Sequence, residues 1–160
     1  MTDRYLPTSP FLLDAIAEKV ILFDDPAAEE NLRLLMFLTG DQDAINREWA
    51  IYLLAEDQID TPAVRDILQR AAGDSDEAVR AEAILGLAQR DTSIALPLVV
   101  GELRADDPLP SVIEAAELCG LPQLTVTQLG QPACQPETGI PLDQLYTIPP
   151  QPPQMRSARG

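Results

Sequence analysis

Apolar residues recur every three or four positions through most of the first 124 residues, which is the spacing of one face of an α-helix. The clearest face combines Val64, Ile67, Leu68 and Ala71 at positions i, i+3, i+4 and i+7. Several apolar stretches follow a Ser-Pro, Asp-Pro or Thr-Pro pair, in which a capping side chain precedes a proline suited to the first helical turn. The pattern predicts about seven helices and no strand. They form a first helix and three helix pairs, over 9–23, 26–56, 61–90 and 93–122.

The starts of these helices are marked by side chains that can accept hydrogen bonds from free backbone N–H groups. The predicted caps, in chain order, are Ser9, Asp25, Asp41 or Asp43, Thr61, Asp74, Thr92 or Ser93, and Asp107. Glu77 stands three residues after Asp74 and can complete a capping box with it. The caps and the apolar faces therefore predict the same elements.

Much of the sequence returns after a shift of 33 residues. The first and second helix pairs share Gly40 and Gly73, Asp41 and Asp74, Arg47 and Arg80, Ala50 and Ala83, Leu54 and Leu87, and Ala55 and Ala88. The second and third share Asp74 and Asp107, Val79 and Val112, Ala83 and Ala116, and Leu85 and Leu118. A period of this length is typical of stacked helical repeats. We expect the alanines that follow this step to lie where helices approach closely in every layer: Ala17, Ala50, Ala83 and Ala116.

Each repeated unit is a helix, a tight turn with Asp, and a second helix carrying Val-Arg-x-x-Ala. The middle unit shows the pattern best, through Asp74, Val79, Arg80, Ala83 and Leu87. The first unit has Asn46 in place of Val, and the third has Ile113 in place of Arg. The pattern resembles HEAT repeats, especially the short bacterial type shared with phycobilisome lyases. The resemblance implies an all-α fold, an α-α superhelix in which stacked helix pairs bury one continuous core.

The resemblance also assigns a structural role to four charged residues, Asp41, Arg47, Asp74 and Arg80. In HEAT repeats such side chains form a ladder between neighbouring units. By this resemblance Arg80 reaches back to Asp41, and Arg47 lacks an equally obvious acidic partner in the preceding cap helix. We interpret the four residues as structural and not as catalytic.

The character of the sequence changes after the predicted solenoid of residues 1–124. Seven of the fifteen prolines lie between Pro132 and Pro153, which predicts a Pro-rich extended tail over 125–160. Two interpretations of the tail stay open. It is disordered, as its composition indicates, or its apolar residues cover the exposed end of the last repeat, which a solenoid needs to have covered.

The chain is strongly acidic, with 26 Asp and Glu residues against 11 Lys and Arg and a net charge of −15. The charges of the tail cancel, so the whole excess belongs to residues 1–124. Such a body repels nucleic acid and membrane surfaces and attracts basic partners. The first thirty residues have no basic start followed by an apolar core, so we expect no signal peptide, and no apolar run approaches a bilayer-spanning length. We therefore expect a soluble, cytoplasmic protein that binds neither nucleic acid nor membrane.

The sequence lacks the commonest general base and the commonest metal ligand. It has no histidine and so no imidazole to activate a Ser or Cys nucleophile. No glycine-rich phosphate loop is present, and the acidic pairs at helix starts are better explained as caps than as cation sites. We expect no catalytic residue, no metal and no cofactor. The resemblance to phycobilisome lyases leaves a phycobilin-lyase-like enzyme as a remote alternative.

What remains is a surface for a protein partner. In HEAT stacks the second helices line the concave side, and here these helices are predicted at 43–55, 75–89 and 109–119. Ala81 and several charged or aromatic residues of these helices are expected to point outward. The candidate partner-binding residues are Glu48, Trp49, Tyr52, Glu77, Glu82 and Glu114.

Two interpretations of Trp49 and Tyr52 are open. The helix that carries them is buried on most sides, or the two rings anchor an Arg-rich peptide in an acidic cleft through cation–π and charge contacts. The favoured hypothesis is a non-enzymatic protein-interaction module, an adaptor or scaffold whose acidic concave face holds a basic protein. The alternative is an acidic inhibitor or immunity-type protein that blocks a basic toxin or nuclease.

Overall fold

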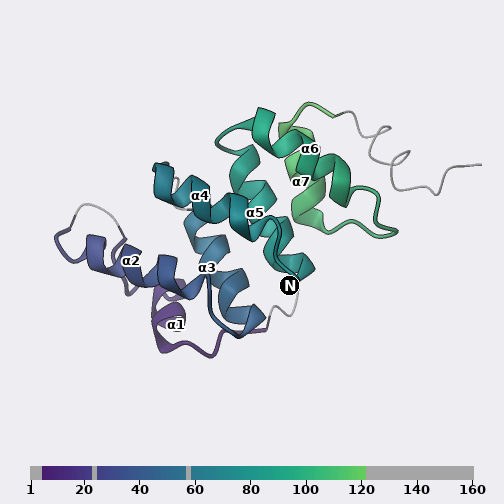
Figure 1. Ribbon diagram of the computed structural model, residues 1–160. Coiled ribbons are helices and arrows are strands. Elements are labelled where there is room, and N and C mark those ends of the chain that lie inside the picture. The colour runs from purple at the N-terminus through teal and green to yellow at the C-terminus, as the bar shows by residue number, and fades with distance from the viewer. Residues whose placement is uncertain (1–4, 23–24, 57–58, 122–160) are drawn as a thin grey trace, which may run out of the picture.

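Seven helices and no strand make up the part of the chain that the computed structural model describes, residues 5–22, 25–56 and 59–121. The helices are α1 (Pro10–Ile16), α2 (Ala28–Leu38), α3 (Ala44–Glu56), α4 (Pro62–Ala71), α5 (Glu77–Ala88), α6 (Thr92–Glu102) and α7 (Pro110–Leu118). They stack in pairs along one direction (Figure 1). The predicted all-α fold and α-α superhelix are confirmed.

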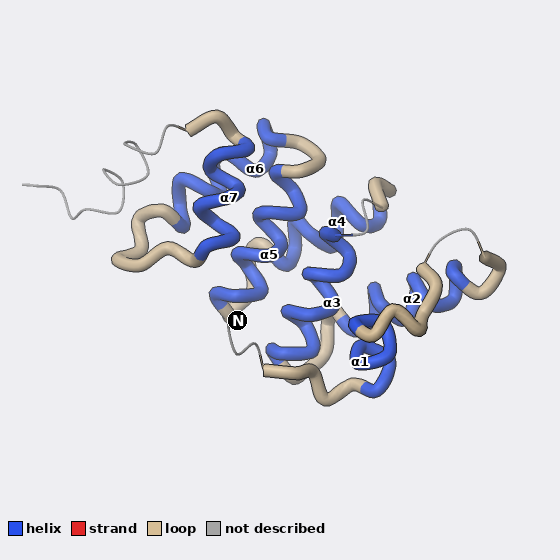
Figure 2. The backbone as a smooth tube through the Cα atoms, turned by 180° about the vertical axis from the view of Figure 1, so that it is seen from behind, coloured by secondary structure: helices blue, strands red, loops and turns tan. Residues whose placement is uncertain are grey.

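The second helices of the three pairs, α3, α5 and α7, lie side by side and form one layer (Figure 2). The first helices, α2, α4 and α6, each pack against the second helix of their own pair, and α1 packs against α3. Helix α5 lies at the centre and contacts α3, α4, α6 and α7. Nine of its twelve residues are buried as a result. The apolar faces that no pair could bury alone are therefore buried between pairs.

Three of the four recurring alanines lie in the core at equivalent points. Ala50, Ala83 and Ala116 on α3, α5 and α7 are each 0% exposed. The prediction is wrong for Ala17, which is exposed because α1 has already ended before it. The stack therefore has three equivalent layers, and the segment before α2 is not a fourth.

Helix α1 ends at Ile16, so the helix predicted over 9–23 is too long. Glu18 takes a left-handed backbone conformation, with φ of 56°. Its N–H donates to the carbonyl of Ala15 at 3.0 Å, and the N–H of Lys19 donates to the carbonyl of Asp14 at 2.9 Å. These two bonds form a Schellman motif, with Glu18 at the position where glycine is usual. The apolar residues that follow at helical spacing therefore lie outside the helix, where Leu22 packs against the core and Ile21 is exposed.

The predicted caps are partly confirmed. The hydroxyl of Thr61 accepts a hydrogen bond from the N–H of Val64 at 3.3 Å, and a carboxylate oxygen of Asp43 accepts one from Ile45 at 3.0 Å. The prediction of Asp74 as the cap of α5 is wrong, because Asp76 caps that helix.

Two later starts also differ from the prediction. Asp91 caps α6 in place of Thr92 or Ser93, since its carboxylate reaches the amides of Ser93 and Ile94. Helix α7 begins at Pro110, after Leu109, and so Asp107 is not its cap. At α5 and α6 the cap is the acid that directly precedes the first turn with an extended backbone, Asp76 and Asp91.

Within the described ranges no helix combines the length and the apolar character that crossing a bilayer requires. The boundary expected at residue 124 and the tail expected over 125–160 lie outside the described residues.

Candidate functional site

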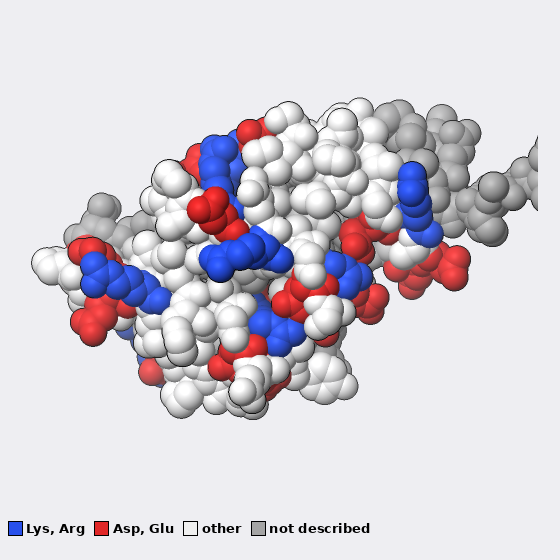
Figure 3. All heavy atoms as spheres, viewed as in Figure 1, with Lys and Arg blue, Asp and Glu red and all other residues white. Residues whose placement is uncertain are grey.

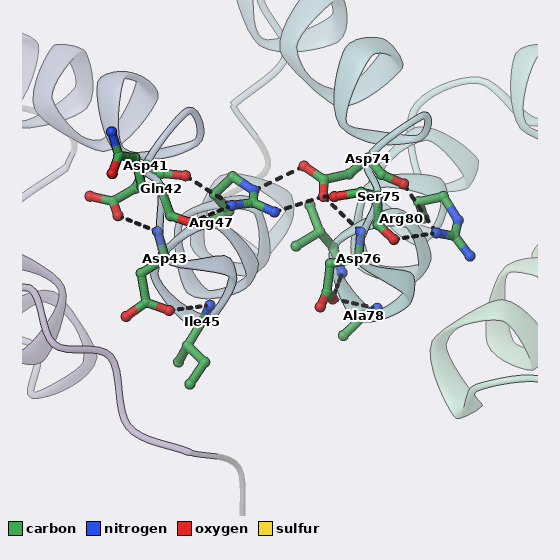
Figure 4. A network of polar contacts seen from close by, with 11 residues as sticks. Asp41, Gln42, Asp43, Ile45, Arg47, Asp74, Ser75, Asp76, Ala78 and Arg80 are labelled. Carbon is green, nitrogen blue, oxygen red and sulfur yellow. Dashed lines mark hydrogen bonds and ion pairs between the residues drawn. The ribbon is translucent and has the colours of Figure 1, made fainter.

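An arginine at the start of each of α3 and α5 links its own turn to the next helix pair. Nε and Nη2 of Arg47 donate to the two carboxylate oxygens of Asp74, both at 2.9 Å. Its Nη1 donates to the backbone carbonyls of Asp41 at 2.9 Å and Gln42 at 3.1 Å (Figure 4). The guanidinium is thereby fixed between two turns. These hydrogen bonds hold the pKa of Asp74 below its usual range, and they raise that of Arg47.

The same arrangement recurs one unit later with a different acid. Nη1 of Arg80 donates to the carbonyls of Asp74 at 3.0 Å and Ser75 at 3.3 Å. Its Nε donates to Glu102 at 2.9 Å, a residue of α6. Asp107, the equivalent of Asp74 by the repeat, is exposed.

Arg47 and Arg80 do link neighbouring units, but the predicted direction of the ladder is wrong. The resemblance to HEAT repeats predicts that Arg80 reaches back to Asp41 and that Arg47 lacks an obvious acidic partner. Nη1 of each arginine instead donates to the backbone carbonyls of its own turn. Its Nε therefore points toward an acid of the following helix pair. Asp41 takes part through its carbonyl, while its side chain accepts a hydrogen bond from the N–H of Asp43 at 2.8 Å.

One candidate hollow lies between the N-terminal halves of α3, α5 and α7. It encloses about 330 Å³ and is lined by Glu48 of α3, Ala81 and Glu82 of α5, and the segment 109–111 at the start of α7. Glu82 is only 4% exposed and accepts a hydrogen bond from the hydroxyl of Ser111 at 2.9 Å. The prediction that Ala81 and Glu82 point outward is wrong, because the start of α7 covers this part of α5.

A second hollow, of about 560 Å³, lies between α3 and the segment that follows α1. Trp49 and Tyr52 line it in an edge-to-face arrangement, with ring centroids 5.6 Å apart and planes at 85°. The indole N–H of Trp49 donates to the carbonyl of Tyr5 at 2.8 Å. Both rings are half-buried, since α3 turns Ala50, Ile51, Leu54 and Ala55 into the core and leaves the rings at its edge.

The six predicted partner-binding residues therefore do not form one patch. Glu48 and Glu82 line the first hollow, and Trp49 and Tyr52 line the second; both hollows share α3. Glu77 and Glu114 are exposed on α5 and α7 and line neither hollow. On the side seen in Figure 3, acidic and basic side chains lie next to one another and do not form a field of one sign. In the described segments no group of three Cys, Asp or Glu side chains is arranged to hold a metal ion.

The family model for HEAT repeats matches residues 31–119, more than half of the chain. The chain belongs to the HEAT-repeat family.

Among its relatives is Protein YibA of Escherichia coli K12, which is 30% identical over 102 residues. That match covers 64% of this chain and 35% of YibA, and Protein YibA of Escherichia coli O157:H7 matches equally. A crystal structure of YibA from E. coli resembles this chain with a TM-score of 0.51 and 25% identity, over 76% of this chain and 48% of that one. The chain thus spans about a third of the length of these curated relatives.

The departure from the HEAT pattern at Asn46 has a structural cause. Val79 and Val112, at the equivalent positions, are buried among apolar residues, and Asn46 is also buried, at 4% exposed. Its side-chain oxygen accepts hydrogen bonds from the N–H groups of Thr8 at 2.9 Å and Ser9 at 3.2 Å, and its Nδ2 donates to the Thr8 hydroxyl at 3.0 Å. Asn46 therefore fastens the segment before α1 to the first HEAT unit.

Two residues of the second hollow, Glu18 and Glu56, were not singled out from the sequence. Glu56 could have been found, because it follows Trp49 by seven residues and Tyr52 by four, and so shares their side of α3. Glu18 could not have been found, because the sequence predicts a helix through this position and has no glycine to mark the left-handed turn there.

Proposed function

We propose that this HEAT-repeat chain is a non-enzymatic adaptor that holds a basic segment of a partner protein on the face formed by α3, α5 and α7. The supporting observation is the exposed edge of α3, where the half-buried rings of Trp49 and Tyr52 line one hollow together with Glu18 and Glu56, and Glu48 of the same helix lines the other. Aromatic side chains held in place by their neighbours lose little conformational freedom on binding and are frequent anchors of protein interfaces.

The charge of the chain supports the choice of a basic partner. The 15 excess acidic charges favour encounters with a basic surface. Because exposed charges are screened over about 8 Å at physiological salt, this attraction mainly raises the association rate. Affinity then depends on the anchors at the edge of α3.

The test is capture of a partner on the immobilised chain, followed by affinity measurements with three variants. Trp49→Ala removes an anchor, Glu48→Lys reverses a charge at the first hollow, and Glu30→Lys reverses an exposed charge on α2 as the control. We expect the first two to weaken binding by about tenfold or more and the control to leave it nearly unchanged. Thermal melts of each variant establish that it is folded. Full binding by both Trp49→Ala and Glu48→Lys would refute this face.

A second candidate function is supported by the net charge of −15 alone: an acidic inhibitor or immunity-type protein that blocks a basic toxin or nuclease. The two differ in kinetics and in consequence. An electrostatically steered inhibitor associates much faster at low salt than at high salt and abolishes the activity of its target. An adaptor leaves the activity of its partner intact. Measuring both on the captured partner separates them.

A further inference from the structure

The hollow between α3 and the segment after α1 has apolar walls and an acidic rim. Ile16, Val20, Leu22 and Leu53 contribute aliphatic surface, and Trp49 and Tyr52 contribute aromatic surface. Glu18 and Glu56 are its charged lining residues among those described, and both are exposed. An uncharged apolar ligand would leave these two carboxylates without a complementary charge.

We propose that this hollow binds an arginine side chain, together with an adjacent apolar residue, from the partner segment. The proposal rests on the proposed function and adds to it the identity of the side chain and the place where it binds. The aliphatic stem of arginine covers apolar surface, its planar guanidinium stacks on aromatic rings, and its five N–H groups reach carboxylates in a fixed geometry. Lysine offers the same charge without the planar stacking surface.

The aromatic wall is fixed before any ligand arrives. The indole N–H of Trp49 bonds the carbonyl of Tyr5 at 2.8 Å, and its ring meets that of Tyr52 edge to face. A preformed wall reduces the entropy lost on binding. A cation near such a ring is attracted by the electron-rich face, and more strongly where the site excludes water.

The backbone of Glu18 gives an independent test of its side chain. Glycine suits the left-handed position that Glu18 occupies, with φ of 56°, at the end of α1. A glutamate there costs stability, which binding sites tolerate when the side chain serves the ligand. Glu18→Gly should therefore raise the melting temperature while removing a carboxylate from the rim.

The experiment uses the fluorescence of Trp49, the only tryptophan of the chain, which reports directly on this hollow. The probes are three blocked dipeptides: acetyl-Leu-Arg-amide, acetyl-Leu-Lys-amide, and acetyl-Leu-citrulline-amide, which keeps the shape of arginine without its charge. We expect a saturable change with Leu-Arg, and binding weaker by about three- to tenfold with Leu-citrulline. Equal binding of these two dipeptides, or no saturable change at their solubility limit, would overturn the proposal.

Three variants then locate the charge. Glu18→Gly and Glu56→Gln should each weaken Leu-Arg binding about three- to tenfold, whereas Glu30→Gln, which removes an exposed charge on α2, should not. If Glu18 is only structural, Glu18→Gly raises stability and leaves dipeptide binding unchanged, and that result contradicts the proposal.

The same variants separate this proposal from the adaptor function. A captured partner that is lost with Glu48→Lys but retained with Glu18→Gly and Glu56→Gln would refute the arginine site and leave the adaptor face standing. If the chain binds Leu-Arg specifically but Trp49→Ala and Glu48→Lys leave the affinity for the captured partner unchanged, the adaptor face is refuted and the arginine-binding hollow stands.

Discussion

Arg47 of α3 and Asp74 of the next HEAT unit form a two-point ion pair whose side chains are only 15% and 16% exposed. The pair lowers the pKa of Asp74, so the folded state binds a proton there less readily than the unfolded chain does. Its contribution to stability is therefore complete above the unfolded pKa of about 4, and it is lost as the pH falls through the lower pKa of the folded state.

The variant Asp74→Asn tests this pair while keeping the side-chain oxygen that accepts the N–H of Asp76. We expect a loss of about 1–3 kcal/mol in the free energy of unfolding at pH 7, because the arginine loses a charged partner. In urea titrations from pH 7 to acid, the difference from the parent chain should shrink below about pH 4. The control is Arg33→Ala in the exposed pair with Glu29, which should cost at most about 1 kcal/mol. A difference for Asp74→Asn that stays constant into acid would contradict the pairing.

Asn46→Val restores the residue of the HEAT pattern, and we expect it to destabilise the protein. The amides of Thr8 and Ser9 lose their acceptor, at a cost of about 1–3 kcal/mol in the free energy of unfolding. Ile113→Arg also restores the pattern, but at a position 36% exposed, and should change stability by no more than about 0.5 kcal/mol. Chemical denaturation of both variants checks the pair of expectations; a more stable Asn46→Val would show that the segment before α1 does not need this anchor.

Gly86 of α5 packs closely against both α3 and α4. A methyl group there would lie 2.9 Å from Cβ of Ala55 and 3.3 Å from both terminal methyls of Leu68. Gly86→Ala should therefore cost about 1–3 kcal/mol through overpacking, despite the better helix propensity of alanine. Gly101→Ala, in α6 with nothing within 4 Å, should gain about 0.5–1 kcal/mol. Thermal melts of the two variants should shift in opposite directions, and a common direction would refute the close packing.

Arg90, just after the end of α5, donates hydrogen bonds to backbone carbonyls at the C-terminal end of α3. Its Nη2 donates to the carbonyls of Leu54 at 2.9 Å and Ile59 at 3.0 Å, and its Nη1 donates to that of Gly86 at 2.8 Å. Burial lowers the pKa of Arg90. Arg90→Lys should cost about 1–3 kcal/mol, since one ammonium cannot replace this fork of donors. The same change at the exposed Arg104 should be nearly neutral in the same denaturation assay, and equal effects would contradict the role of Arg90.

The repeat of 33 residues was enough to predict the layering, because equivalent positions on stacked helices meet the same environment. Ala50, Ala83 and Ala116 are accordingly buried alike. The direction of the ladder was not predictable, since the same spacing lets an arginine reach either neighbour. Hydrogen bonds to the backbone carbonyls of its own turn orient the arginine toward one neighbour. The side-chain pattern of the sequence does not predict these backbone hydrogen bonds.

The candidate site was predicted only in part. Trp49 and Tyr52 drew attention because they are rare and one turn apart, and they line one hollow together. Glu82 was misplaced because periodicity along α5 cannot reveal that Ser111, 29 residues later, covers it. Glu18 was missed because it occupies a left-handed turn at the end of α1, and such a turn is usually predicted from a glycine. Here the residue at that position is glutamate.

The forward reach of the arginines gives the stack a head and a tail. Arg47 joins the first HEAT unit to the second, and Arg80 joins the second to the third, but Ile113 stands where a third such arginine would be. The three units are thus not interchangeable. If a rearranged gene exchanged the last two units, Ile113 would stand where an arginine has to bond an acid of the following unit, and the polar link between those two units would be lost.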